Sequence, residues 1–146
     1  MKENKLNVGF SVGITASIIM LLFHIVVDLI YERRAISDYF LWAIQLIFYF
    51  FIGMTAANKD YHNNIDMDEP LNGMLNAARG SGMVLSAIIW VYIFLRAMIV
   101  GAFQVFGGLG IGMTMAFLVL DFSMAIGLST FGGSLVKKQH DFENYE

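Results

Sequence analysis

The chain has 146 residues, of which 58 % are apolar and only 14 % are charged, and its net charge is −3. A soluble domain is closer to half apolar and a quarter charged, so this composition indicates a membrane protein. The chain has no cysteine, which excludes disulfides and thiolate metal sites, and no basic block, so no nucleic acid is expected as a partner.

Four long apolar runs follow one another along the chain, at about residues 8–30, 39–58, 82–104 and 109–136. Each run has the roughly twenty residues needed to cross ~30 Å of hydrocarbon, and backbone groups in lipid must be satisfied within the segment. We therefore predict an all-α integral membrane protein, with four transmembrane helices in a compact bundle that forms one domain over residues 1–146. The first run is too long for the core of a signal peptide and predicts a retained anchor.

A longer polar connection, residues 59–81, separates the second run from the third. Within it, Pro70 follows acidic residues, as is typical of the first turn of a helix. Apolar residues then recur at helical spacing at Leu71, Met74, Leu75 and Ala78. The pattern predicts a short interfacial helix before the third span, or an extension of that span.

Lysine and arginine are unevenly divided between the two sides of the predicted bundle. If the N-terminus is inside, the outer side holds Arg33 and Arg34, and the inner side holds Lys2, Lys5, Lys59, Arg79, Lys137 and Lys138. Cytoplasmic connections carry the excess of basic residues in membrane proteins. The count predicts that both termini are cytoplasmic and that the protein lies in the cell membrane.

Each predicted span carries a polar residue at a similar depth. At ~1.5 Å per residue, His24, Gln45, Arg96 and Asp121 lie roughly 20–24 Å from the inner ends of their helices. Asp28 continues from this layer toward the outer surface, one helical turn beyond His24. Ionisable residues inside a membrane are costly, so these five residues are the candidate site.

Two pairs within this layer have competing interpretations. Arg96 and Asp121 could form a structural ion pair, act as a charge relay or ion site, or pair with another subunit. His24 and Asp28 are four residues apart, which lets a carboxylate orient an imidazole as in proton relays, but a hydrated helix end has the same pattern. A metal site normally needs at least three protein ligands, so no metal and no cofactor are expected.

Small residues mark helix faces suited to close packing. Two sets of such residues are predicted to pack against other helices: Gly9, Gly13 and Ser17 in the first span, and Gly108, Gly112 and Ala116 at the fourth. The second set is turned from Asp121 by roughly 100–180° at ~100° per residue.

These features predict a non-catalytic subunit of a homo- or hetero-oligomeric membrane complex, held together by a buried polar layer. Its expected partners are membrane lipid and either other membrane proteins or further copies of itself. One alternative is an oligomeric transporter or channel for an ion, proton or small solute, lined by the polar layer. A second alternative is a membrane enzyme that uses His24 and Asp28.

Overall fold

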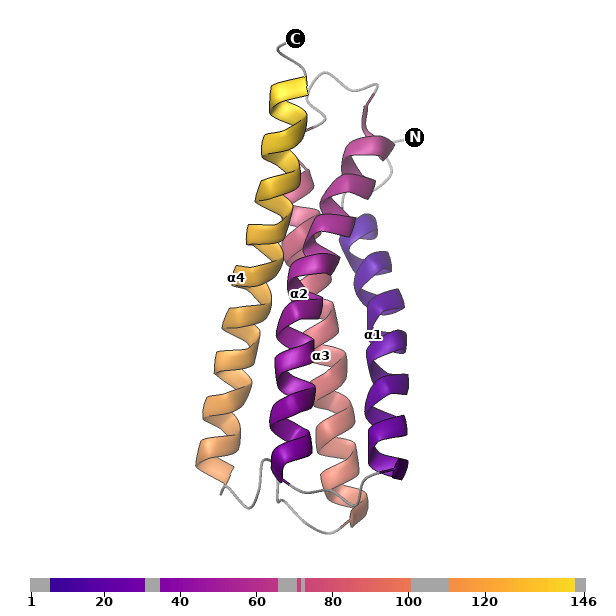
Figure 1. The fold of residues 1–146 in the computed structure, drawn as a ribbon, viewed down its shortest axis with the longest axis vertical. Coiled ribbons are helices and arrows are strands. Elements are labelled where there is room, and N and C mark those ends of the chain that lie inside the picture. Colours follow the sequence, from indigo (N-terminus) through magenta and orange to yellow (C-terminus); the bar gives the residue numbers. More distant parts are fainter. Residues whose placement is uncertain (1–5, 31–34, 66–70, 72, 101–110, 144–146) are drawn as a thin grey trace.

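Four α-helices make up almost all of the structure, a computed structural model that describes residues 6–30, 35–65, 71, 73–100 and 111–143 (Figure 1). They are α1 (Leu6–Ile30), α2 (Ala35–Asn63), α3 (Met74–Val100) and α4 (Ile111–Glu143). No β-strand occurs within these described residues. The prediction of an all-α protein is confirmed to that extent.

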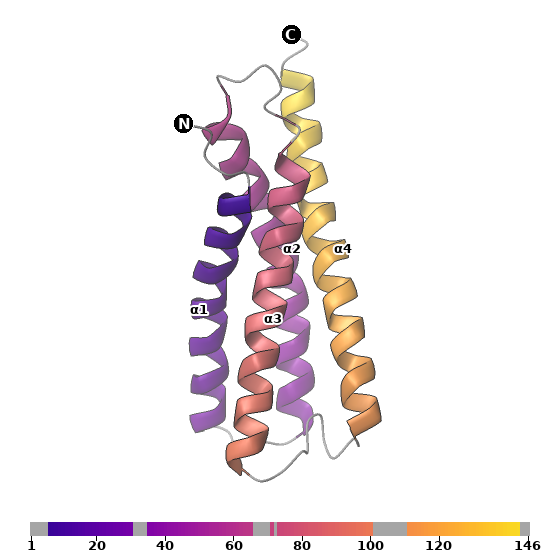
Figure 2. The same ribbon diagram turned by 180° about the vertical axis from the view of Figure 1, so that it is seen from behind.

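The helices run alternately in opposite directions, so α1 begins and α4 ends at the same end of the bundle, called here the terminal end (Figure 1). The middle of the bundle is formed by α2 and α3, with α1 on one flank and α4 on the other (Figures 1 and 2). Both flanking helices pack against both central helices, and the central helices pack against each other. A site between three helices therefore includes α2 and α3.

All four helices are long and apolar enough to cross a membrane, over Val8–Ile30, Tyr39–Asn63, Met74–Met98 and Gly112–Phe142. The chain is thus a multi-pass membrane protein, as its apolar runs predict. Compared with those runs, the helices are longer at the terminal end. The reason is that an apolar run stops at the first polar residues, whereas a helix continues through them once it leaves the hydrocarbon.

The interfacial helix expected before the third span is not a separate element. Met74, Leu75 and Ala78 form the first turns of α3, so this segment extends the span. Met74 and Ala78 are completely buried in a cluster that also contains Ala57 of α2, so they pack on protein rather than on the membrane surface. Pro70 lies outside the described residues.

Glycines bring helix backbones into direct contact at two interfaces. A Cβ added to Gly53 of α2 would overlap the backbone of Ser129 on α4, and Gly132 of α4 is held as closely against α2. A Cβ on Gly9 of α1 would overlap the backbone of Ala77 on α3. Helices in lipid associate through such close van der Waals packing, because lipid tails remove the hydrophobic driving force between them.

Two glycine-to-alanine substitutions are expected to differ in their effect on stability. Alanine is favoured over glycine by up to ~1 kcal/mol in a helix, and at Gly127 of α4 the added methyl group meets open space. Gly127→Ala should therefore leave the free energy of unfolding unchanged or slightly raised. Gly53→Ala should lower it by about 1–2 kcal/mol, since overpacking against a fixed backbone outweighs the helix propensity.

Unfolding by titration of detergent micelles with dodecyl sulfate measures both variants. The same effect for Gly53→Ala and Gly127→Ala would contradict the close contact between α2 and α4.

Polar side chains at the terminal end fix α3 and α4 against α2. Asp60 of α2 is completely buried, and its carboxylate lies against Gly73, directly before α3. A helix N-terminus favours a negative charge because of the aligned peptide dipoles. On α4, the ring of His140 stacks on Tyr61 with centroids 3.8 Å apart, and its Nε2 lies 3.1 Å from Oδ1 of Asn58.

Candidate functional site

The carboxylate of Asp121 lies inside the bundle between α4 and the two central helices, and the residue is only 1 % exposed. Its hydrogen bonds come from five side chains, three on α2 and two on α3: Trp42, Gln45, Tyr49, Ser86 and Trp90. These six residues are called here the Asp121 cluster.

Four of the five donors of the Asp121 cluster lie at ordinary hydrogen-bond distances from the carboxylate, and Gln45 lies slightly further away. The hydroxyls of Tyr49 and Ser86 each lie 2.7 Å from Oδ2. The indole Nε1 of Trp90 is 3.0 Å from Oδ2, and that of Trp42 is 3.0 Å from Oδ1. The amide nitrogen of Gln45 lies 3.3 Å from Oδ1 and 3.2 Å from Oδ2. Both carboxylate oxygens are therefore occupied by donors.

The chemistry of these donors defines what the Asp121 cluster can do. An indole N–H has no lone pair and can only donate, so Trp42 and Trp90 require an acceptor at this point. Bonds from neutral donors to a carboxylate are about twice as strong as those between neutral groups. A bound cation would instead need oxygen lone pairs directed at it. The arrangement therefore suits a structural tie between three helices rather than an ion site.

A second set of polar residues joins α1 to α3. It lies closer to the far end of the bundle, away from the terminal end. The carboxylate oxygen Oδ2 of Asp28 accepts a hydrogen bond from the Tyr92 hydroxyl at 2.6 Å and lies 3.1 Å from Nε of Arg96. The ring of His24 is 5.9 Å from that of Tyr92 in an edge-to-face arrangement. These four residues are called here the Asp28 cluster.

The predicted ion pair between Arg96 and Asp121 is wrong. Arg96 pairs with Asp28 of α1, and Asp121 is bonded by neutral side chains of α2 and α3. The physical reason is the rotation of α3. Trp90 and Arg96 are six residues apart, which places them about 120° apart around the helix axis. Trp90 faces α4, so Arg96 is turned toward α1.

The five candidate residues fall into two groups. Gln45 is brought to Asp121, whereas Arg96 is brought to Asp28 and His24 lies beside Tyr92, which also binds Asp28. Arg96 lies six residues beyond Trp90 on α3, or about 9 Å further along the helix. The structure therefore places the five residues at two depths, where a single layer was expected. Among the described residues no three His, Asp or Glu side chains gather as metal ligands would.

Most of the Asp121 cluster was missed by reasoning from the sequence. Gln45 and Asp121 were among the candidate residues, but Trp42, Ser86 and Trp90 were not considered. A signal was present, since Trp42 precedes Gln45 by three residues and Ser86 precedes Trp90 by four, spacings that put each pair on one helix face. Both tryptophans of the chain belong to this cluster.

The small residues of the first span pack within the chain. Gly9, Gly13 and Ser17 are buried, and Gly9 and Gly13 face α3. The residues of the second set differ: Gly112 and Ala116 of α4 are exposed, with nothing close to the position of a Cβ on Gly112. Gly108 lies outside the described residues.

Comparison of the chain with known proteins adds no further information on the site: no family model matches it, and no curated protein or solved structure is similar enough to count as a match.

Proposed function

We propose that the protein is a non-catalytic subunit of a homo- or hetero-oligomeric complex in the cell membrane, with both termini cytoplasmic. The observation that supports a role in assembly is the exposed face of α4. Small residues follow this face along the helix: Gly112, Ala116, Ser123 and Gly127. They lie within about 60° of one another at ~100° per residue, and about 120–180° from Asp121.

This small-residue face has the length and chemistry of a helix-packing surface. From Gly112 to Gly127 it extends about 22 Å, most of the ~30 Å of hydrocarbon. The hydroxyl of Ser123 donates to the carbonyl of Val119 at 2.8 Å, so it leaves no unpaired donor on this face. Small residues let another backbone approach closely, and this gain is absent against lipid.

The alternatives have less support from the intramembrane groups. A transporter needs a carboxylate that can meet its cargo, whereas both oxygens of Asp121 accept bonds within the chain. An enzyme acting through His24 and Asp28 needs an available base, whereas Asp28 already binds Tyr92 and Arg96. The polar groups thus serve cohesion of the bundle better than turnover.

Bulky residues on the small-residue face should dissociate the complex without unfolding the chain. In Gly112→Leu/Ala116→Leu the new side chains project from an exposed face and prevent close approach of a partner. Contacts of this kind are worth ~0.6–2 kcal/mol each, so the loss of about 2 kcal/mol should weaken association roughly thirtyfold. The protein mass of the particle purified in mild detergent, corrected for bound detergent, should fall to the 16.4 kDa of one chain.

The matched control is Ser11→Leu/Ala43→Leu, which adds comparable bulk at exposed positions of α1 and α2. It should keep the mass of the native complex. A native chain that purifies alone as a stable monomer, or a complex that survives the α4 variant unchanged, would overturn the proposal. Identification of co-purifying chains distinguishes a hetero-complex from a homo-oligomer.

A further inference from the structure

Two surface grooves meet along one ridge of α2. The ridge consists of Phe51, Thr55 and Lys59, which are four residues apart and line both grooves. The α1–α2 groove, of about 490 Å³, runs between the ridge and residues of α1 such as Thr15 and Ile19. On the other side of the ridge is the α2–α4 groove, of about 660 Å³. Lys59 therefore belongs to both grooves, at the part of each that lies nearer the terminal end.

The α1–α2 groove is apolar along its length and polar only near the terminal end. Phe48 and Ile19 line the part nearer the middle of the bilayer, and Thr55 and Lys59 line the part nearer the terminal end. Phe48 and Lys59 are eleven residues apart, or about 16 Å along α2. That is close to half of the ~30 Å hydrocarbon thickness, so the groove spans about one leaflet. Its length and lining suit an acyl chain.

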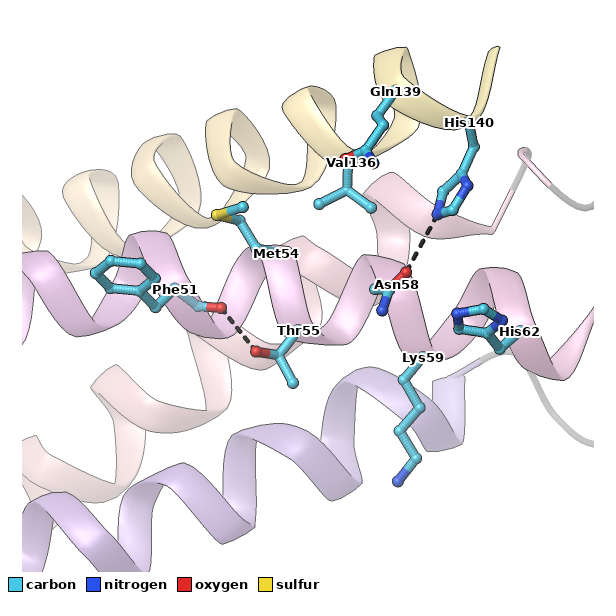
Figure 3. A pocket seen from close by; sticks show the side chains of 9 residues that line it. All are labelled: Phe51, Met54, Thr55, Asn58, Lys59, His62, Val136, Gln139 and His140. Carbon is cyan, nitrogen blue, oxygen red and sulfur yellow. Dashed lines mark hydrogen bonds between the residues drawn. The ribbon is translucent and has the colours of Figure 1, made fainter. Parts of the chain in front are cut away.

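The α2–α4 groove is more polar in the part nearer the terminal end (Figure 3). Met54 and Val136 line its apolar part, and Asn58, His62 and His140 line the polar part. The stacking of His140 on Tyr61 gives this wall a fixed shape. Here too the apolar part leads toward the interior of the bilayer and the polar part toward the terminal end.

The charge at the junction of the grooves is positive. Lys59 is exposed, no ion pair joins it to another described residue, and its side chain extends from α2 toward α1 (Figure 3). His62, one turn further along α2, is also exposed. Among the residues that the structure describes, no Asp or Glu lines either groove, and the neighbouring Asp60 is completely buried against Gly73. An anion is favoured at this point, and the cation of a zwitterionic headgroup is not.

We propose that this surface binds one anionic glycerophospholipid. Its two acyl chains lie in the α1–α2 and α2–α4 grooves on either side of the ridge, and its phosphate binds the ammonium group of Lys59, with His62 and Asn58 as further donors. Two grooves that are apolar toward the bilayer interior and share one lysine have the geometry that such a lipid needs. This lipid site is independent of the proposed role in a complex, because no residue of the small-residue face takes part.

The test compares phosphatidylglycerol with phosphatidylcholine of the same acyl chains, added to the delipidated full chain in mild detergent and followed by native mass spectrometry. One lysine at a membrane surface favours an anionic lipid by about fivefold, equivalent to ~1 kcal/mol. The native chain should show this preference for one bound lipid. In Lys59→Gln the preference should disappear, so that the two lipids bind about equally.

Two matched controls separate the site from general surface charge. Lys138→Gln removes the same charge from the terminal end, but Lys138 lies over the ring of Phe142 and lines neither groove. It should keep the fivefold preference. Thr15→Phe fills the α1–α2 groove and should weaken binding of both lipids, whereas Ser11→Phe, exposed on α1 and outside both grooves, should not.

Any of three results would overturn the proposal: no preference for phosphatidylglycerol in the native chain, an unchanged preference in Lys59→Gln, or an equal loss in Lys138→Gln. Lys59 and Thr15 are both exposed, so the variants are expected to fold, and the emission of Trp42 and Trp90 checks this.

Discussion

Asp121→Leu is expected to lower the free energy of unfolding by about 3 kcal/mol. The substitution removes the acceptor of five donor side chains, four of which belong to buried residues. Interhelical hydrogen bonds in membranes average ~0.6 kcal/mol each, and five of them give that total. Asp121→Asn keeps one carbonyl oxygen but places an amide N–H₂ among donors, so it should lose roughly half as much. No other single substitution removes as many interhelical bonds among the described residues.

The cluster contains its own probe, because Trp42 and Trp90 are the two tryptophans of the chain and both donate to Asp121. Tryptophan emission, followed during dodecyl sulfate titration, reports stability and the environment of the cluster together. Ser11→Leu, an exposed polar-to-apolar change on α1, is the control and should alter neither quantity. If Asp121→Leu kept both the native stability and the native emission, the cluster would not hold the three helices together.

Asp28 and Arg96 are expected to be energetically coupled, whereas no coupling is expected between Arg96 and Asp121. Arg96→Leu and Asp28→Leu should each lower the free energy of unfolding by about 2 kcal/mol, less than the ~3–5 kcal/mol of a fully buried pair. The expected loss is smaller because both side chains are partly exposed, 23 % for Arg96 and 12 % for Asp28. The double variant should recover about 1 kcal/mol of the summed loss, because no charge is then left without its partner.

The same cycle with Asp121 provides the control. Arg96→Leu and Asp121→Leu lie in separate clusters, so their effects should add to within ~0.5 kcal/mol. A coupling between Arg96 and Asp121 as large as that between Arg96 and Asp28 would restore the pairing expected from the sequence and contradict the observed rotation of α3.

The number of spans could be predicted from the sequence because crossing a bilayer depends on the length and hydropathy of each run alone. The partner of Arg96 could not be predicted in this way, because it depends on the rotation of α3 about its axis and on which helices lie beside α3. Counting residues gives depth to within about one turn, ~5.4 Å, and gave Arg96 and Asp121 similar depths. Because α1 and α4 lie on opposite flanks, the side of α3 that turns Arg96 toward α1 turns it away from Asp121 on α4.

The small residues illustrate the same limit. The pattern Gly9-Gly13-Ser17 predicts a close helix contact, and the structure supplies it within the chain, on α3. Gly112 and Ala116 give an equally good pattern, yet α4 turns them outward. A small-xxx-small spacing predicts that the backbone of another helix approaches closely, but it does not predict which helix this is. The terminal end of α3 was left with two interpretations for a related reason. Met74 and Ala78 suit an interfacial helix as well as an extension of the span, and only their burial against α2 and α4 decides for the extension.

The position of Asp121 on the last helix has a consequence for biogenesis. The donors of α2 and α3 are synthesised before their acceptor, so a chain that stops after α3 would hold two indoles, an amide and two hydroxyls in the bilayer with no carboxylate to receive them. Helix α4 therefore completes the core as well as extending it. An unfinished chain therefore differs from a finished one by polar groups in the bilayer that lack their acceptor, and polar groups inside a membrane are costly.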